Sequence, residues 1–298
     1  MRSTKRMLRP DLVAASAQLI APPVTRFAPS PTGYLHLGHI VNAIYTWGVA
    51  RALGGRVILR LEDHDRIRSR PEYEAAILED LDWLGFEPDE KRSHLLRQSD
   101  TPELYRDVLN ELKRASHVYA CDCSRSDIGG ERYAGRCRAR GLSEIPGHGI
   151  RVGLDPVTVR CDDLLAGPIE QTPVEQCGDL LLRDRDGNWT YQFAVTVDDL
   201  RQGVTLVIRG ADLLSSTGRQ VLLGQLPGRQ SPACFLHHPL ILGPRGEKLS
   251  KSAGDTGVRE LRSQGFSPED VIGRAAAAIG LLDSPRPVRA QDVSSLFL

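Results

Sequence analysis

The sequence lacks an excess of charge of either sign. Its 298 residues contain 38 lysines and arginines and 38 aspartates and glutamates, so no overall positive field is available to hold a nucleic acid nonspecifically. Any contact with RNA must come from a local cluster of charged side chains. The balanced charge therefore neither favours nor excludes an RNA partner.

The sequence also lacks a long apolar run. No stretch reaches the roughly 18 to 20 residues that a membrane-spanning helix needs, and we therefore expect no membrane contact. The first 24 residues carry four basic side chains and one acidic one without an amphipathic pattern. We interpret residues 1–24 as an N-terminal extension, although such a charge bias slightly resembles an organellar transit peptide.

Cysteine is too scarce for a disulfide framework. The chain has six cysteines and no secretory signal, which indicates thiols or a metal site in a reducing compartment. We expect a cytoplasmic protein. Repeats and low-complexity segments are also lacking, and 41% hydrophobic with 26% charged residues is the composition of an ordinary globular protein.

What is present in the first 115 residues is an alternation of strands and helices. Residues 24–28 and 56–61 form short apolar runs that predict strands, and the periodic apolar positions after Leu37 predict a helix. Further helices are expected from about 72 to 84 and from 102 to 115. This order predicts parallel βαβ units and therefore an α/β fold.

The pattern becomes irregular over residues 116–177, which we interpret as an insertion. Beyond it, Asp186-Gly187 predicts a hairpin turn between strand-like runs. We expect a buried strand at 204–208, a helix at 216–226 and a strand at 240–242 that runs into a glycine-rich loop. The predicted organisation is an extension (1–24), a first half-domain (25–115), an insertion (116–177), a second half-domain (178–255) and a short helical C-terminal region (256–298).

The turn after the first strand places His36, Gly38 and His39 where a helix begins. Helix N-termini attract phosphate. Two imidazoles at that point can donate to oxygens whose charge grows when the α-phosphate of a nucleotide is attacked, and a glycine leaves room for an adenine ring. Taken alone, this short pattern is also compatible with a helix start that carries incidental histidines.

A second motif, Lys248-Leu249-Ser250-Lys251-Ser252, lies in a loop flanked by glycines. Lysine supplies a compact charge that can follow the β- and γ-phosphates, and charge stabilised only in the transition state accelerates the reaction. The alternative is a solvated basic loop, because most charge clusters lie on the surface. The presence of both motifs in one chain favours nucleotide chemistry.

The third motif is Cys121-x-Cys123 followed, after nine residues, by Tyr133-x3-Cys137. Three thiolates and one phenol can complete a tetrahedral zinc site. Tyrosine is an uncommon ligand, so ordinary buried or surface thiols are an equally valid interpretation of the spacing alone. Three further cysteines lack such spacing and are interpreted as core or surface thiols: Cys161, Cys177 and Cys234.

Together these segments resemble the HIGH and KMSKS signatures of class I aminoacyl-tRNA synthetases. The glutamyl branch is indicated by R-F-A-P-S-P-T-G-Y-L-H-L-G-H at 26–39, L-R-L-E-D at 59–63, Tyr191-Gln192 and I-R-G-A-D-L at 208–213. The similarity extends over most of residues 25–255. It implies a Rossmann-type catalytic domain, with a zinc-bearing insertion, of a ligase that activates glutamate with ATP and Mg²⁺.

The resemblance also assigns residues to roles. It implies a glutamate site made by Arg26, Phe27, Ala28, Pro29, Ser30, Glu62, Tyr191 and Arg209. It implies an ATP site made by His36, Gly38, His39, Lys248 and Lys251, with His36, His39 and Lys251 as the catalytic residues. Glutamate carries two carboxylates and one ammonium group, each of which needs a partner when it leaves water.

Within the glutamate site, Arg26 and Arg209 supply two guanidinium forks, and Glu62 is expected to take the ammonium group. The alternative for Arg26 and Glu62 is that they form surface ion pairs of little energetic value. We expect Lys251→Ala to retain glutamate binding and to slow pyrophosphate exchange greatly.

The acceptor is the remaining question. The C-x-C, Y-x3-C spacing resembles the structural zinc site of the glutamyl-queuosine tRNA(Asp) synthetase family, and the chain ends soon after Ser252, where glutamyl-tRNA synthetases continue into an anticodon-binding domain. The resemblance implies a monomer with one zinc ion that transfers glutamate to queuosine in the anticodon of tRNA(Asp). The alternatives are a minimal glutamyl-tRNA synthetase that charges tRNA(Glu), a noncatalytic tRNA-binding paralogue and, more distantly, another nucleotidyltransferase of the same superfold.

Overall fold

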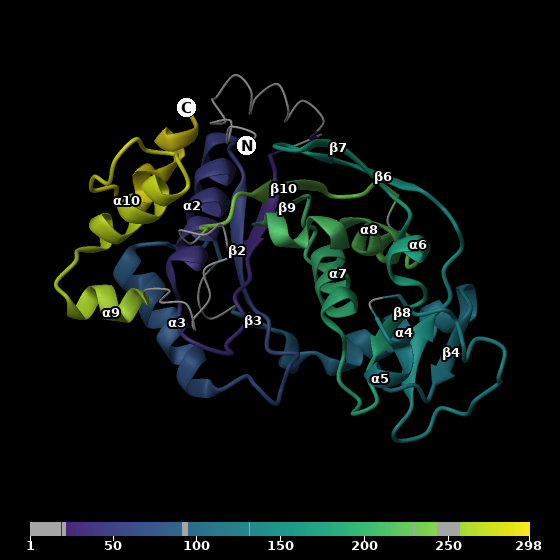
Figure 1. Cartoon of the computed structure of the whole chain (residues 1–298). Helices are drawn as coiled ribbons and strands as arrows, with labels where there is room; N and C mark the ends of the chain where they lie inside the picture. Colours follow the sequence, from purple (N-terminus) through teal and green to yellow (C-terminus); the bar gives the residue numbers. More distant parts are fainter. Residues whose placement is uncertain (1–18, 20–21, 91–94, 131, 229, 243–256) are drawn as a thin grey trace.

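The computed structural model describes residues 19, 22–90, 95–130, 132–228, 230–242 and 257–298 (Figure 1). The predicted motif at 248–252 therefore lies outside the described residues. None of the helices in the described ranges is long and apolar enough to cross a membrane.

Parallel strands form the centre of the molecule. One sheet has the order β1-β2-β3 and the other the order β7-β6-β10-β9, and all neighbouring strands are parallel except β6 and β7. The strands are β1 (Val24–Phe27), β2 (Arg56–Leu61), β3 (Leu96–Arg97), β6 (Val159–Asp163), β7 (Gly167–Gln171), β9 (Leu206–Gly210) and β10 (Cys234–His238). β1 lies beside β9, because the Thr205 N–H donates to the Val24 carbonyl at 2.9 Å.

This arrangement confirms the predicted α/β fold and determines where a ligand can bind. The carboxyl ends of β1 and β9 meet at the point where the strand order reverses. Crevices for ligands form at such points, because the loops that follow the two strands leave in opposite directions.

Helices cover the parallel strands on both sides (Figure 1). The helix α2 packs its buried residues into one core with β1 and β2, whereas α7 and α8 belong to a second core with β6, β9 and β10. The helix bounds are α2 (Leu37–Ala52), α3 (Pro71–Leu84), α4 (Pro102–Ala115), α7 (Tyr191–Arg201) and α8 (Thr217–Gln225). The helix α3 begins with a proline and ends at Gly85, whose φ of 80° is the left-handed conformation that glycine adopts readily.

The insertion contains an antiparallel sheet in the order β4-β5-β8, formed by β4 (Val118–Cys121), β5 (Gly149–Val152) and β8 (Leu180–Arg183). Two short helices accompany it, α5 (Arg125–Ile128) and α6 (Pro173–Cys177). Sheet membership does not follow the expected boundary at residue 177, because β6 and β7 join the second parallel sheet and β8 joins the insertion. The predicted hairpin at Asp186-Gly187 is not a full one. After this turn the chain makes a single β-bridge, between Arg183 and Trp189, and then enters α7.

The predicted strand at 240–242 was wrong. The strand next to β9 is β10, which ends at His238, immediately before Pro239. Proline has no N–H to donate to a neighbouring strand, so the ladder stops there, and beyond it Leu242 makes only a single-residue bridge.

The C-terminal region is short and helical, as expected. It contains α9 (Val258–Ser263), α10 (Pro268–Ala278) and the 3-10 helix η6 (Ala290–Phe297), of which α10 and η6 pack against α2. The contact with η6 depends on Gly48, because a Cβ atom at that position would lie 2.3 Å from the Phe297 ring. Two shorter 3-10 helices are η3 (Gln98–Asp100) and η4 (Ala211–Ser216).

Candidate active site

A cavity of about 800 Å³ opens at the carboxyl ends of β1, β2, β9 and β10, and we call it the central cavity. The residues predicted from sequence that line it are Arg26, Phe27, Ala28, Pro29, Ser30, His36, Gly38, His39, Glu62, Tyr191 and Arg209. The structure thus brings together every predicted glutamate and nucleotide residue that it describes. Lys248 and Lys251 lie outside the described residues.

The two histidines stand at the first turn of α2. His36 is the N-cap residue, and its Nδ1 accepts a hydrogen bond from the Gly38 N–H at 3.1 Å. The His39 Nδ1 accepts from the His36 N–H at 3.2 Å, and the two ring centroids are 3.9 Å apart. Because each Nδ1 is an acceptor, the proton of each neutral ring is on Nε2, which is the donor that a phosphate oxygen requires.

Gly38 is needed for this geometry. A Cβ atom at residue 38 would lie 2.9 Å from Cε1 and 3.1 Å from Nδ1 of the His36 ring. Any larger residue would therefore push His36 away from the helix terminus, where unpaired N–H groups give the site its positive potential.

The wall at β1 and β2 is a buried network of ion pairs. Arg26 donates from Nε to Asp199 Oδ1 at 2.9 Å, and Arg60 donates from Nη1 to the same oxygen at 2.8 Å. Arg60 also donates from Nη2 to Glu62 Oε1 at 2.8 Å. Although burial alone would lower it, the pKa of Arg60 is raised because Asp199, Glu62 and Asp198 surround the guanidinium. The network fixes Arg26 and Glu62 on one side of the cavity.

Arg209, at the end of β9, also lines the cavity, next to Ile208, whose carbonyl accepts from Arg26 Nη1 at 3.3 Å. Arg209 Nη1 donates to Gln220 Oε1 at 2.5 Å, and its Nη2 donates to Thr217 Oγ1 at 3.0 Å. Burial lowers the pKa of Arg209 from its very high ordinary value, and the guanidinium stays charged. Burial also raises the pKa of Tyr191, so its hydroxyl stays protonated.

The resulting cavity suits a small molecule that carries two negative groups and one positive group. Arg26 and Arg209 supply two cations in a setting of low dielectric constant, and Glu62 supplies an anion in the same lining. Each charge of a ligand that enters this cavity needs a side chain of opposite charge, because a buried charge without a partner is costly.

Sequence reasoning missed several residues of the site. Asp199 and Arg60 lie within a helix and a strand whose patterns signal burial only, and their role depends on contacts between segments 139 residues apart. Asn42 lines the cavity one turn after the histidines and donates to His238 Nε2 at 3.1 Å. The run His237-His238-Pro239 was a signal that could have been pursued.

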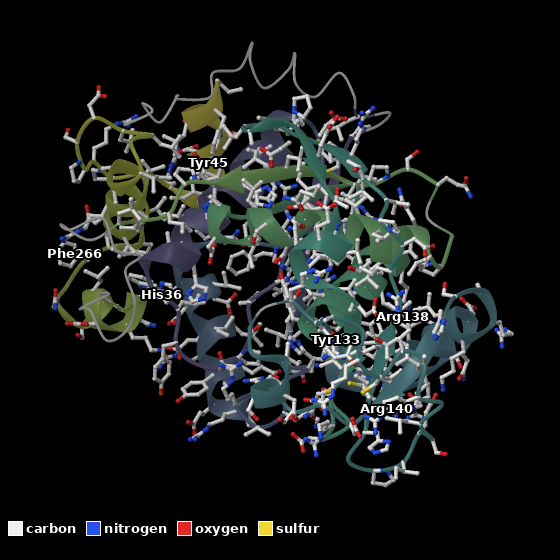
Figure 2. The ribbon with its side chains drawn as sticks, turned by 45° about the vertical axis from the view of Figure 1, so that its right-hand side comes forward. His36, Tyr45, Tyr133, Arg138, Arg140 and Phe266 are labelled. Atoms are coloured by element: carbon white, nitrogen blue, oxygen red, sulfur yellow. The ribbon has the colours of Figure 1, made fainter. Side chains whose placement is uncertain are left out.

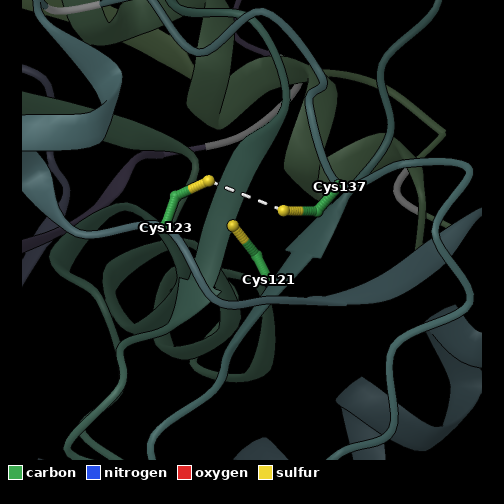
Figure 3. Close-up of side chains that lie close together, drawn as sticks. All are labelled: Cys121, Cys123 and Cys137. Atoms are coloured by element: carbon green, nitrogen blue, oxygen red, sulfur yellow. Dashed lines mark hydrogen bonds between the residues drawn. The ribbon is translucent and has the colours of Figure 1, made fainter.

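The three cysteines predicted as metal ligands converge in the insertion (Figure 3). The sulfur atoms of Cys121, Cys123 and Cys137 lie within 4.8 Å of one another, and those of Cys123 and Cys137 are 3.5 Å apart. Ligand sulfurs about 2.3 Å from a tetrahedral metal ion lie roughly 3.8 Å apart, so the cluster has the size of a metal site. Among the described histidines, cysteines and acidic residues, no other group of three or more is close enough to hold a metal ion.

Tyr133 completes the cluster. Its hydroxyl oxygen lies 3.4 Å from the Cys121 sulfur and accepts from the Cys137 N–H at 2.8 Å. Two arginines donate to the sulfurs, Arg151 to Cys121 and Arg140 to Cys137, each at 3.4 Å. Figure 2 shows Tyr133 and Arg140 together, well apart from His36.

The charges at this cluster also fit a cation. Although burial alone would raise it, the pKa of Cys121 is lowered because Tyr133 and Arg151 stabilise the thiolate. Burial and the neighbouring sulfurs raise the pKa of Cys123 to about 11. A divalent ion would supply the positive charge that deprotonates such a thiol, so the residues present fit a structural metal ion.

Comparison with known proteins defines the class. Residues 23–146 and 141–280 match the family described as tRNA synthetases class I (E and Q), catalytic domain. The chain belongs to this family, which consists of ligases.

Individual relatives narrow the similarity. The chain is 42% identical, over 91% of each sequence, to a protein of Symbiobacterium thermophilum named glutamyl-Q tRNA(Asp) synthetase. It is 41% identical to a glutamate–tRNA ligase of Nitratidesulfovibrio vulgaris, over 84% of this chain and 55% of that protein. The crystal structure of a glutamate tRNA ligase from Elizabethkingia meningosepticum in complex with its amino acid aligns with a TM-score of 0.76 and 29% identity, over 92% of this chain and 64% of the other. The chain thus spans about half to two thirds of the glutamate ligases it matches.

Proposed function

We propose that this protein activates L-glutamate with ATP to form glutamyl adenylate and then transfers the glutamyl group to queuosine in the anticodon of tRNA(Asp). The observation that carries the first half is the central cavity, which is lined by Arg26, Arg209 and Glu62 and by two histidines at a helix N-terminus. An anionic amino acid and a nucleotide phosphate fit these two ends of one cavity.

In the first step, an oxygen of the α-carboxylate forms a bond to the α-phosphorus of ATP, and the bond from that phosphorus to the pyrophosphate oxygen breaks. Negative charge grows on the phosphate oxygens during this exchange. The Nε2–H groups of His36 and His39 would donate to those oxygens, since the hydrogen bonds to both Nδ1 atoms hold the rings, and a donor fixed in advance stabilises the transition state most effectively. Magnesium bound with ATP would neutralise the triphosphate.

We assign Lys248 and Lys251 to the same step on the strength of the KLSKS motif alone, since they lie outside the described residues. Their charge would stabilise the departing pyrophosphate. The work of the protein in this step is positioning and electrostatics, with no covalent intermediate on a side chain.

In the second step, a hydroxyl oxygen of queuosine forms a bond to the carbonyl carbon of the glutamyl adenylate. The bond from that carbon to the phosphate oxygen breaks, AMP leaves and the hydroxyl proton passes to solvent. Two observations support queuosine as the acceptor. The chain matches a protein named glutamyl-Q tRNA(Asp) synthetase over 91% of both sequences, and its insertion carries the C-x-C, Y-x3-C cluster.

A second cavity is available for the acceptor. It has a volume of about 310 Å³, adjoins the central cavity at Tyr191 and reaches the insertion at Tyr133 and Arg151. Arg219 adds a further cation to its lining. An acceptor nucleoside entering here would bring its hydroxyl toward the amino-acid end of the central cavity. We propose that Cys121, Cys123, Tyr133 and Cys137 bind a structural Zn²⁺ ion. The ion would stabilise the insertion where it lines the second cavity and would take no part in the chemistry.

The test uses ATP, labelled glutamate and two preparations of total tRNA, one from cells that make queuosine and one from cells that do not. We expect label in tRNA only when queuosine is present, and we expect the label to survive removal of the 3′ adenosine. Labelling that does not depend on queuosine would overturn the assignment of the acceptor. Absence of glutamate-dependent ATP–pyrophosphate exchange would overturn the proposed activation itself.

The charging of tRNA(Glu) is a second candidate, favoured by the 41% identity to a glutamate–tRNA ligase. It predicts label on the 3′ adenosine, which nuclease digestion would release. ATP–pyrophosphate exchange measured without any tRNA tests the activation step separately from the transfer to tRNA, because it reports formation of the adenylate alone.

A further inference from the structure

Arg209 contacts His237, which in turn contacts Asp163, and neither of these two residues lines the central cavity. Its Nε lies 3.0 Å from His237 Nε2, and His237 Nδ1 lies 2.6 Å from Asp163 Oδ2. The side chains of His237 and Asp163 are almost entirely shielded from solvent, at 1% and 0% exposed. The three residues come from β9, β10 and β6, the neighbouring strands of one sheet.

The chemistry of arginine fixes the protonation of His237. A guanidinium Nε–H can only donate, so His237 Nε2 must be the acceptor and carries no proton. The ring proton is then on Nδ1, where it donates to the Asp163 carboxylate. His237 is thereby specified as the neutral Nδ1–H tautomer, because a proton on Nε2 would point at another donor.

Asp163 is itself fixed at both oxygens. Its Oδ1 accepts from the N–H groups of Leu165 and Ala166 at 2.8 and 2.6 Å, and its Oδ2 also accepts from the His237 N–H at 3.0 Å. Although burial alone would raise it, the pKa of Asp163 is lowered by the hydrogen bonds from His237 and from these backbone groups. The carboxylate therefore stays charged and holds the imidazole in one orientation.

The other contacts of Arg209 do not replace this one. Nη2 donates to Thr217 Oγ1 and to the Leu213 carbonyl oxygen at 3.3 Å, and Nη1 donates to Gln220, but none of these bonds reaches Nε. Thr217 Oγ1 also lies 3.2 Å from His237 Nε2, so the hydroxyl is part of the same arrangement. A guanidinium binds a carboxylate well only when its plane is fixed, because its hydrogen bonds are directional. The bond from Nε to His237 is the contact that fixes the position of Nε.

We propose that His237, oriented by Asp163, is a positioning residue that sets the affinity for glutamate by fixing Arg209, a role that rests on the proposed glutamate site. Neither residue touches the substrate. The pair resembles a carboxylate–imidazole pair in form, but the imidazole serves as a fixed acceptor for a guanidinium and transfers no proton.

Two substitutions at one position separate the positioning role from a purely structural one. His237→Gln puts an amide oxygen near the place of Nε2 and retains an acceptor for Arg209. His237→Asn puts an amide nitrogen near the place of Nδ1 and retains only the donor to Asp163. We expect His237→Asn to raise the Kd for glutamate, measured by calorimetry, at least tenfold, since an unpaired buried donor is costly. We expect His237→Gln to stay within about threefold of the unsubstituted protein by the same reasoning.

The same variants are assayed by ATP–pyrophosphate exchange, with the KM for ATP as the internal control. We expect the KM for glutamate to follow the Kd and the KM for ATP to change less than about twofold, because the contacts lie at the amino-acid end of the cavity. Equal losses in both variants, or an unchanged glutamate Kd in His237→Asn, would overturn the proposal. Absence of exchange in the unsubstituted protein would instead count against the proposed function.

A measurement on the unsubstituted protein covers the case in which the variants do not fold. The ¹⁵N chemical shifts of the histidine rings distinguish protonated from unprotonated ring nitrogens. We expect His237, assigned by through-bond correlation, to show an unprotonated Nε2 and a protonated Nδ1 at neutral pH. The opposite tautomer, or an imidazolium, would contradict the arrangement with Arg209.

Discussion

The carboxylate of Asp199 and the guanidinium of Arg26 form an ion pair shielded from solvent, with 2.9 Å between Oδ1 and Nε. The same oxygen accepts from Arg60, the most deeply buried arginine of the network. Although burial alone would raise it, the pKa of Asp199 is lowered by the two arginines. One carboxylate oxygen therefore links the wall of the central cavity to the core behind it.

Asp199→Asn should destabilise the protein and weaken glutamate binding together. The substitution keeps the shape of the side chain but leaves Arg26 and Arg60 without their shared anion, and loss of one partner from a buried pair costs about 3–5 kcal/mol. Denaturant unfolding measures the change in free energy. The matched control is Glu103→Gln, since Glu103 pairs with Arg106 on the surface at 3.0 Å and such pairs contribute less than about 1 kcal/mol. Equal effects of the two substitutions would contradict the role of Asp199.

The ion-pair network beside the central cavity contains both residues that the sequence predicted and residues that it did not. The residues Arg26 and Glu62 were predicted because the segments that carry them, 26–39 and 59–63, resemble those of the glutamyl branch. Asp199 and Arg60 were not, because a buried ion pair depends on which helix face meets which strand. No local pattern records that contact.

The same limit applies elsewhere in the fold. The helix at 102–115 and the strand at 56–61 were predicted with their observed bounds, since proline, glycine and apolar periodicity are local signals. The strand Cys234–His238 was missed because its buried histidines disguise an apolar run. Those histidines are buried because Asp163, Asn42 and Arg209 supply partners from distant segments.

Gly38→Ala should reduce ATP-dependent activation without unfolding the protein. The added methyl group would lie 2.9 Å from the His36 ring and force it out of its capping position. We expect kcat for pyrophosphate exchange to fall at least about tenfold, because complete removal of one well-placed donor typically costs about a hundredfold or more. Gly130→Ala is the control, since nothing lies within 4 Å of a Cβ atom there. Unchanged exchange in Gly38→Ala would show that the His36 position is unimportant.

The cysteine cluster should bind about one zinc ion per chain, measured by elemental analysis of the purified protein, since its donor set matches a closed structural site. Cys137→Ser should lose the metal and lower the melting temperature, because the binding free energy of a structural ion contributes to folding. Tyr133→Phe should retain the metal with weaker affinity, since three thiolates remain.

Cys234→Ala is the matched control for the metal prediction. Cys234 is buried but lies in β10, outside the cluster, so its loss should leave the zinc content unchanged. Equal zinc content in Cys137→Ser and in the unsubstituted protein would contradict the assignment of the ligands.

His238 should make the stability of the protein depend on pH. Burial lowers the pKa of His238 to about 4. Its hydrogen bonds suit a neutral ring, since Nδ1 donates to the Pro239 carbonyl oxygen at 2.9 Å and Nε2 accepts from the Asn42 amide at 3.1 Å. An unfolded histidine has a pKa of about 6.5, so between about pH 6.5 and 4 the unfolded chain binds the extra proton. The free energy of unfolding should therefore fall as the pH is lowered through this window, by up to about 3 kcal/mol from this residue.

Asp80 works in the opposite direction, because burial raises its pKa to about 6 and the folded state then binds the proton first. The contribution of His238 is isolated by comparing the unsubstituted protein with His238→Phe, which keeps a flat ring next to Tyr45, whose ring stacks on His238 with 5.2 Å between centroids. Since Asp80 is present in both proteins, its effect cancels in the difference of their unfolding free energies at each pH. We expect that difference to shrink as the pH falls from 6.5 to 4, because only the unsubstituted protein loses stability through His238. A difference that stays constant over this range would mean that His238 titrates alike in the folded and unfolded states.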